Sequence, residues 1–203
     1  SYHVCYDDNS YELLDLDRRA RQNVRKGLKN CTVKKISFDR LNKEGWILEL
    51  DTAKRQNRNL TRDKYDWEIR CDTASKLPGF EAWGAIIDDK LVASLLTFQM
   101  ENCCEMISQQ CHSSYMNKRI NNALCYVVTQ EMVNRKNIQS IFYTLQPLDA
   151  PDSVDDFKFR MGYKPKPVRQ RVVFNSYLSP GINIVSYSIV KWMYNHTSIN
   201  SSL

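Results

Sequence analysis

The middle of the chain constrains the fold most, because the spacing of its apolar residues changes partway along. Three runs rich in aliphatic and aromatic residues, at 80–87, 91–100 and 103–110, are separated by short polar segments at hairpin-like distances. Apolar residues then recur with helical spacing from Ile120 to about residue 136, and a strand-like run follows at 140–145. The pattern predicts a three-stranded antiparallel meander, then a helix, then a further strand.

The residues before this stretch are expected to be mostly helical. An amphipathic helix is predicted at 10–29, because apolar residues recur there at helical spacing: Leu13, Leu16, Ala20, Val24 and Leu28. Asn9 or Ser10 could cap its start. A short strand is expected at 33–38, and two or three short helices are expected from there to residue 76.

The residues after the stretch predict a loop at 145–151 and a short helix at 152–161, which Gly162 would close. A last strand is expected at 168–174, and the tail from Pro180 is expected to be a helix docked on the body. The whole reads as a mixed α/β (α+β) fold with about six strands. We expect one domain over 1–203, with a mostly helical part at 1–78, a sheet core at 79–174 and a C-terminal helix at 175–203.

Composition limits the class of protein. No apolar run approaches the roughly 18 to 20 residues of a membrane span, and the first residues lack the layout of a signal peptide. The seven cysteines form no CxxC pair and no His stands at zinc-ligand spacing, so free thiols and no metal site are expected. The sequence therefore predicts a cytoplasmic protein without integral membrane association.

The net charge of +6 is concentrated in two segments. Residues 18–35 hold eight Lys or Arg and residues 158–171 hold six, with no acid in either segment. An uncompensated basic surface attracts phosphate-bearing partners such as a nucleotide cofactor or RNA. The alternative interpretation is a solvated helix face and a basic loop.

Three segments together resemble the GNAT acyltransferase superfamily. Residues 80–93 are similar to its central hairpin, residues 117–124 to the start of its donor-binding helix, and residues 156–163, which end in Gly162-Tyr163, to its late helix. The resemblance implies a centrally splayed mixed sheet, an acyl-CoA donor such as acetyl-CoA, and a small-molecule or peptide amine as acceptor. It implies no DNA partner.

The Arg-rich segment 18–27 further resembles the Fem-type branch of that superfamily. This branch includes enzymes that transfer amino acids from charged tRNA to peptidoglycan precursors. The resemblance implies aminoacyl-tRNA as an alternative donor and tRNA as a possible partner.

The resemblance places donor contacts at the end of the third meander strand and at the start of the following helix. The residues concerned are Gln110, Cys111, Asn117, Lys118, Arg119, Ile120, Asn121 and Asn122. Unpaired N–H groups and the positive end of the helix dipole would face the pyrophosphate. Arg119 and Asn121 stand where the family has glycines that let the backbone approach phosphate. Asn121 is expected to tolerate a left-handed conformation there, and Lys118 and Arg119 could add charge.

The resemblance also indicates catalytic positions. Many relatives use a Tyr of the late helix as the acid for the leaving group, and the matching residue here is Lys158, with Tyr163 and Tyr143 as alternatives. Acyl transfer to an amine also needs a base. Glu81, Glu105 and His112 are the carboxylates and histidine of the meander region that qualify as that base. Cys111 could instead be a nucleophile, although direct transfer needs no covalent intermediate.

The sequence therefore predicts an N-acyltransferase that binds donor and amine together, with direct attack in the opening between the meander and strand 140–145. The alternative function is an inert RNA- or nucleotide-binding domain that uses the two basic segments.

Overall fold

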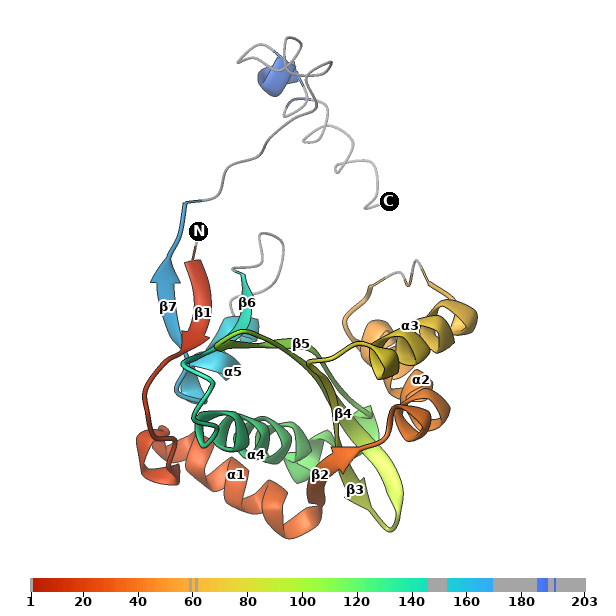
Figure 1. Cartoon of the computed structure of the whole chain (residues 1–203), viewed down its shortest axis with the longest axis horizontal. Helices are drawn as coiled ribbons and strands as arrows, with labels where there is room; N and C mark the ends of the chain where they lie inside the picture. The colour runs from red at the N-terminus through yellow and green to blue at the C-terminus, as the bar shows by residue number, and fades with distance from the viewer. Residues whose placement is uncertain are drawn as a thin grey trace. The chain divides into compact units, whose positions relative to one another are not determined.

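The computed structural model describes residues 2–58, 60, 62–145, 153–169, 186–189 and 192, with side chains at 153 and 154 left aside. Residues 1–168 form one compact unit, and residues 169–203 form a second unit. The first unit contains a seven-stranded mixed sheet with helices on both faces (Figure 1). The mixed α/β prediction is thus confirmed, with one strand more than expected.

The strand order in the sheet is β2-β3-β4-β5-β6-β1-β7. The strands are β1 (Tyr2–Tyr6), β2 (Thr32–Ile36), β3 (Phe80–Ile87), β4 (Lys90–Met100), β5 (Cys103–Cys111), β6 (Ser140–Leu145) and β7 (Lys164–Pro167). All neighbours are antiparallel except β5 and β6, which are parallel. The predicted meander is β3, β4 and β5, and β6 has the predicted bounds.

The sheet is splayed at its centre, between β5 and β6. The two strands pair only from Cys103 to Glu105 on β5 and from Ser140 to Phe142 on β6. Both strands continue past that point, so their later residues leave a gap in the sheet. The centrally splayed sheet that the resemblance implies is therefore present.

One face of the sheet is covered by α4 (Ile120–Val133) and α1 (Arg18–Asn30). The apolar stripe of α4 is buried there, with Ile120, Leu124 and Val128 fully inaccessible to solvent. Helix α1 begins at Arg18, with Asp17 as its cap and a 3₁₀ turn at Leu13–Asp15 before it, rather than at residue 10. Turn chemistry at Asp17 thus outweighs the apolar spacing that suggested an earlier start.

The opposite face is covered by α2 (Phe38–Arg55) and α3 (Lys64–Lys76). Both helices are capped by side chains, since Ser37 accepts from the amide of Arg40 and Asp63 from the amide of Asp66. Leu48 and Trp67 pack over the outer part of the sheet in a second apolar cluster. Two helices thus stand where two or three were expected.

The N-terminal strand β1 was not predicted. It lies between β6 and β7 and pairs with both, with Cys5 opposite Phe142 on one side and opposite Lys164 on the other. The predicted last strand at 168–174 is wrong in its start, because β7 ends at Pro167 and residues 168–169 are not in a strand. This strand forms because it pairs with β1, and no apolar run in the sequence indicates it.

Helix α5 (Ser153–Arg160) matches the predicted helix, and Gly162 follows it with a φ of 88° that a glycine adopts without strain. The predicted loop at 145–151 and residues 170–174 lie almost wholly outside the described residues. Of the predicted C-terminal helix, the structure describes helical residues 186–189 and Trp192, so the single-domain assignment stays a prediction. Among the described helices, none is long and apolar enough to cross a membrane.

Candidate active site

A groove with a volume of about 810 Å³ follows the gap between β5 and β6. Its walls come from β5, β6, the start of α4, α5 and the C-terminal end of α2 with the loop after it. The described part of the chain thus gathers, around one cavity, the strand end, the helix start and the late helix that the sequence analysis assigned to donor binding and catalysis.

The start of α4 forms one end of the groove. Arg119 has a φ of 63° and a ψ of 31°, the left-handed conformation, and its carbonyl accepts from the amides of Asn122 and Ala123. The amides of Ile120 and Asn121 precede these first intrahelical bonds and point out of the helix end. The side chain of Ile120 is fully buried, so this residue could contact a donor only through its backbone.

The residue with the left-handed conformation lies two positions earlier than the sequence indicated. Asn121 was the residue expected to take this conformation, but it is the second residue of the helix, and Arg119 takes it instead. A non-glycine residue in this region carries a backbone cost of roughly 1–2 kcal/mol. Arg119 therefore has a backbone conformation that glycine would adopt without strain, and its charged side chain lines the groove.

Gly27 of α1 lets the two helices approach closely at this end. A Cβ at this position would lie 2.5 Å from the Arg119 carbonyl oxygen and 2.7 Å from the Ala123 Cβ. Helix α1 therefore packs directly against the turn that precedes α4.

Gln109 ties the two sides of the gap together. Its Nε2 donates to the backbone oxygen of Asn121 at 3.0 Å, and its Oε1 accepts from the Tyr143 hydroxyl of β6. The Oδ1 atom of Asn121 is buried and has no hydrogen-bond partner among the described residues. A buried polar atom without a partner is uncommon and is costly unless a ligand or water satisfies it. Asn122 also lines the groove, where its Nδ2 lies 3.6 Å from the sulfur of Met161.

The described lining of the groove is strongly basic. It contains five basic side chains and one acid, and these are Arg55, Arg58, Arg62, Arg119, Lys158 and Glu49. Low-dielectric walls of one charge raise the local concentration of anions. The three arginines near the end of α2 come from the polar stretch to which the sequence analysis gave no function.

The end of α2 is held by one carboxylate beside the turn that precedes α4. Asp51 accepts from the Ser113 amide at 2.7 Å and from the Ser113 hydroxyl at 2.8 Å. Ser113 begins the 3₁₀ helix Ser113–Lys118, which leads into Arg119. This link positions Arg55 and Arg58 on the same cavity as the start of α4.

Lys158 lies in the groove and is 5% exposed. Its Nζ is 2.7 Å from Oδ1 of Asp155 and 5.6 Å from the centre of the Tyr143 ring. The other carboxylate oxygen of Asp155 accepts from the Tyr2 hydroxyl of β1. Burial raises the pKa of Asp155, but the hydrogen bonds from Lys158 and Tyr2 outweigh it and hold this pKa below its ordinary value. The carboxylate therefore fixes Lys158 in place.

The two tyrosines weighed as alternatives to Lys158 differ in position. Tyr143 lines the groove, and burial raises its pKa well above the ordinary value, so its phenol keeps its proton at neutral pH. Tyr163 is 2% exposed, and its hydroxyl is hydrogen-bonded to Thr129 at 2.7 Å inside the core. Only Tyr143 of the pair is placed to reach a bound substrate.

The structure does not bring the predicted bases into the groove. Glu81 is bound by both guanidinium nitrogens of Arg135, at 3.2 and 2.9 Å, and by Lys35 at 2.8 Å. Burial raises its pKa, but these bonds outweigh burial and lower it. Such a carboxylate holds two segments together and is a poor proton acceptor.

His112 caps the 3₁₀ helix through Nδ1, which accepts from the Ser114 amide at 3.3 Å. Neither His112 nor Glu105 lines the groove. Asn117 and Lys118 also lie off the lining, and the Lys118 Nζ is 5.4 Å from the centre of the Tyr115 ring. Glu49 is the one carboxylate among the described lining residues, and no sequence motif distinguished it.

Gln110 and Cys111 lie at the end of β5, where the donor was expected. Gln110 is buried and accepts from the Ser94 hydroxyl at 3.4 Å. Cys111 is fully buried, and burial raises the pKa of its thiol to about 12. A thiol with that pKa is protonated at neutral pH, which argues against Cys111 as a nucleophile.

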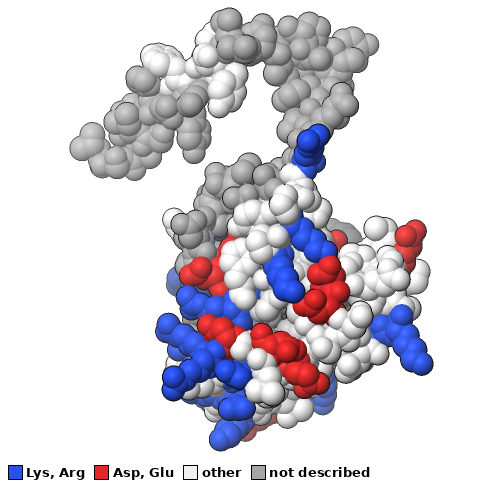
Figure 2. Space-filling view, turned by 90° about the vertical axis from the view of Figure 1, so that its left-hand side faces the viewer, with Lys and Arg blue, Asp and Glu red and all other residues white. Residues whose placement is uncertain are grey.

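The second basic segment is largely neutralised by the fold. Lys164 and Lys166 of β7 form ion pairs with Asp8 and Asp7, which follow β1, while Lys158 pairs with Asp155 and Arg160 with Asp156. Figure 2 shows acidic side chains directly beside basic ones on the face it draws. By contrast, within the fully described α1 the exposed Arg18, Arg19 and Arg25 form no ion pair.

Among the described residues there is no cluster of His, Cys, Asp and Glu that could hold a metal ion.

The chain has the GNAT fold. Over 81% of its length it superposes on the crystal structure of FemX, with a TM-score of 0.66 and 11% identity. It matches a possible acetyltransferase from Clostridium difficile 630 over 72% of its length and 99% of that chain, with a TM-score of 0.57 and 13% identity. It also matches the C-terminal domain of a putative lysylphosphatidylglycerol synthetase from Agrobacterium fabrum over 81% of its length, with a TM-score of 0.58 and 12% identity.

The matched region spans 59% of the FemX chain and 57% of the synthetase domain. No model of a protein family matches the sequence, and neither does any curated protein sequence. The likeness is therefore one of fold, with FemX among the similar structures, and the chemistry has to be argued from the groove.

Proposed function

We propose that the chain is an N-acyltransferase that binds a phosphate-bearing acyl donor and an amine acceptor together and transfers the acyl group by direct attack. The observation that carries the proposal is the groove at the β5–β6 gap, which has the start of α4 and a basic lining at one side and the buried Lys158 at another. The similarity in fold between the chain and acetyltransferases supports the same reaction class.

The donor end of the groove has the chemistry that a pyrophosphate requires. The unpaired amides of Ile120 and Asn121 and the positive end of the α4 dipole favour an anion. Arg119, Arg55 and Arg58 would add charge from the sides, and the buried Oδ1 of Asn121 could accept a hydrogen bond from the donor. These groups would hold the donor whether or not turnover follows.

The transfer step forms a bond from the acceptor nitrogen to the carbonyl carbon and breaks the bond to the leaving group. A base must take the proton that the amine loses, and Glu49, the one carboxylate among the described lining residues, would take it through water. The Lys158 ammonium, held by Asp155, would stabilise the developing oxyanion. The Tyr143 phenol, which stays protonated, would return a proton to the leaving group.

Acyl-CoA is the leading donor, and aminoacyl-tRNA is the second candidate. The second is favoured by one observation, that FemX and the synthetase domain match 81% of the chain whereas the acetyltransferases match 71–72%. A Lys in place of the family's Tyr also suits a ribose hydroxyl leaving group, because a cation stabilises an alkoxide as well as a thiolate. Both donors carry phosphate, so the basic groove accepts either.

Thermal unfolding with CoA, acetyl-CoA and tRNA at two salt concentrations tests the proposal. A ligand that binds only the folded state stabilises it by about RT ln(1 + [L]/Kd) and so raises the midpoint temperature of unfolding. We expect stabilisation by at least one of these donors, and Arg119→Ala should reduce it. Arg25→Ala on the outer face of α1 serves as the matched control and should leave it unchanged. No stabilisation by any of them would refute the proposal.

The same experiment separates the binding-only alternative. If tRNA alone stabilised the fold, if Arg25→Ala abolished that effect and if Arg119→Ala did not, the chain would be an RNA binder that uses α1. Because Lys164 and Lys166 are held in ion pairs, α1 is the one of the two basic segments that would serve that function.

A further inference from the structure

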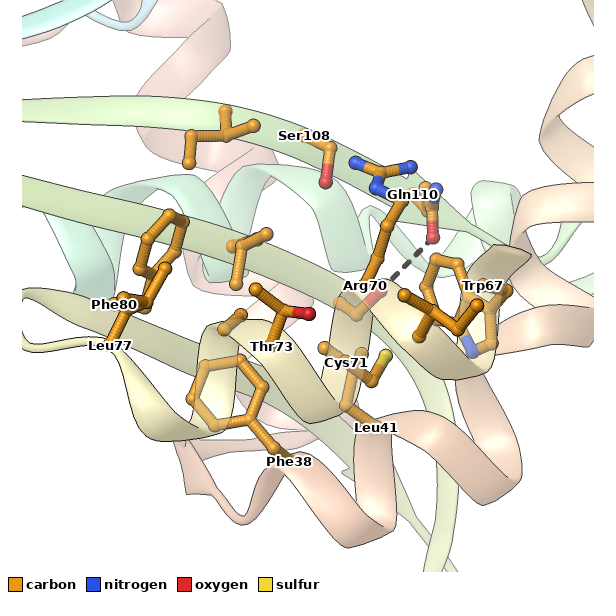
Figure 3. Close-up of a pocket in the computed structure, with 15 residues that line it drawn as sticks. Phe38, Leu41, Trp67, Arg70, Cys71, Thr73, Leu77, Phe80, Ser108 and Gln110 are labelled. Atoms are coloured by element: carbon orange, nitrogen blue, oxygen red, sulfur yellow. Dashed lines mark hydrogen bonds between the residues drawn. The ribbon is translucent and has the colours of Figure 1, made fainter. Parts of the chain in front are cut away.

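A second cavity, of about 370 Å³, lies on the opposite face of the sheet from α4, between α3 and strands β4 and β5 (Figure 3). Its volume falls within the range of about 300–1,000 Å³ of small-molecule pockets. Helices α2 and α3 contribute Phe38, Leu41 and Trp67. Leu77, which follows α3, and Phe80 line one end. None of the predicted catalytic residues lines it.

An irregularity in β5 shapes the floor of this pocket. Leu96 of β4 pairs with Ser108 and Thr97 pairs with Met106, so Ile107 is an extra residue in β5. Such a bulge changes the alternation of side chains between the two faces. Ile107 and Ser108 are therefore both able to line the same pocket, and Gln110 lines it two residues further on.

The pocket borders the groove described above. Ile107, Ser108 and Gln110 line both cavities. Gln110 is buried at this junction and is hydrogen-bonded to Ser94. A ligand that filled the pocket would therefore reach toward the β5–β6 gap, where Lys158 and Tyr143 lie on the other side of β5.

The charge of the pocket limits what it can hold. Its lining includes aromatic and aliphatic side chains and no carboxylate, and its one charged residue is the exposed Arg70. Burying an ammonium group without a partner costs several kcal/mol. A polycationic amine is therefore a poor occupant, whereas an uncharged apolar group gains free energy from the buried surface.

We propose that this pocket holds an uncharged apolar group, aromatic or aliphatic, of the amine acceptor. The inference rests on the proposed function, because the donor contacts lie around the start of α4 and leave this side of the gap to the acceptor. The acceptor's amino group would then extend past Gln110 into the groove. The acceptor class is an amine with an apolar substituent, as opposed to a polyamine or an aminoglycoside.

Binding of 2-phenylethylamine to the full chain without a donor tests the inference, with spermidine as the polycationic comparison. Trp67 lines the pocket and is one of four tryptophans, so occupancy should change the total tryptophan fluorescence of the chain. Backbone amide chemical shifts locate the ligand independently. We expect shifts at Thr73, Ser108 and Gln110 with 2-phenylethylamine and none there with spermidine.

Two matched variants on α3 complete the test. Thr73 and Ser75 are both exposed, but only Thr73 lines the pocket. Thr73→Phe should narrow the pocket and raise the Kd of 2-phenylethylamine at least about tenfold, which corresponds to about 1.4 kcal/mol. Ser75→Phe adds the same ring outside the lining and should leave that Kd within about twofold.

The inference is overturned if the two variants have equal effects, if spermidine shifts the same amides, or if 2-phenylethylamine causes no shift at saturating concentration. The unmodified chain gives the chemical-shift result even if Thr73→Phe unfolds. Loss of donor binding with retained binding of 2-phenylethylamine would refute acyl transfer and leave the apolar pocket in place. Donor binding with no amine at the pocket would refute this inference alone.

Discussion

Replacing Lys158 by Met removes a buried ammonium and leaves its partner, Asp155, behind. The two side chains are 6% and 9% exposed, and their charged atoms are 2.7 Å apart. Removing one member of a buried ion pair typically costs about 3–5 kcal/mol, because the remaining charge has lost its compensation. The Tyr2 hydroxyl still donates to Asp155, so we expect the lower end of the range, about 3 kcal/mol.

Urea or thermal unfolding measures this loss. A destabilisation of about 3 kcal/mol corresponds to a fall of roughly 6–12 °C in Tm for a chain of this size. The double variant Lys158→Met/Asp155→Asn removes both charges, and the Asn side chain can still accept from Tyr2. It should recover most of the stability, because a neutral pair avoids the buried charge.

The pH dependence of the free energy of unfolding gives a second check on this prediction. In the natural protein the pKa of Asp155 is lowered, so its contribution to stability is present above its unfolded pKa and is lost as pH falls through the folded pKa. In Lys158→Met, burial without the ammonium raises that pKa instead. The stability difference between the two proteins should therefore shrink as pH falls from 7 toward 4.

Measurements of kcat separate the contribution of Lys158 to stability from its role in the reaction. Loss of one oxyanion-stabilising group typically lowers kcat about 10²–10³-fold, and the double variant should not recover it. The reasoning is refuted if Lys158→Met loses less than about 1 kcal/mol of stability, the value of an exposed pair. The assigned role is refuted if the double variant regains full turnover.

Three further predictions concern the support of the groove. Arg119→Gly should be about 1 kcal/mol more stable than Arg119→Ala by urea unfolding, because glycine adopts the φ of 63° without strain, and both should weaken donor binding equally in a calorimetric titration. Gly27→Ala should destabilise the chain by about 1–3 kcal/mol and raise the donor Kd, since its Cβ would press on Arg119 and Ala123; an unchanged Tm would contradict the close packing. Glu81→Gln should lower stability by about 1 kcal/mol, because it weakens the bond to Arg135, while leaving kcat unchanged. A large loss of kcat with a normal Tm would show instead that Glu81 acts as the base.

The sequence predicted the parts of the fold in which local pattern and burial agree. Helix α4 has an apolar stripe that is buried in the core. Strand β6 is a short run of residues that favour strands, bounded by polar segments. Both elements were therefore predicted at the right place. Strand β7, with the sequence KPKP, has no apolar face, and only pairing with β1 makes it a strand. That pairing joins residues more than 150 positions apart in the sequence, which no local pattern reveals.

The same limit applies to the groove. Arg119 and Lys158 were identified because they stand at positions defined by the resemblance, and both line the cavity. Arg55 and Arg58 were missed, since contacts between distant residues, such as the bond between Asp51 and Ser113, bring the end of α2 beside the turn that precedes α4. The bond between Glu81 and Arg135 was not foreseen, because the two residues lie 54 positions apart in the sequence.

The position of β1 in the sheet has a consequence for the order in which the fold can form. Contacts between residues far apart in the sequence close large loops, and folds rich in them form slowly. Strand β1 has no partner strand until β6 has been made, at residue 145, and it gains its second partner, β7, only when residue 167 has been made. The hydrogen bond from Tyr2 to Asp155 forms in the same late step. The β6–β1–β7 half of the sheet, and with it the final placement of Lys158, should therefore be the last part of the first unit to fold.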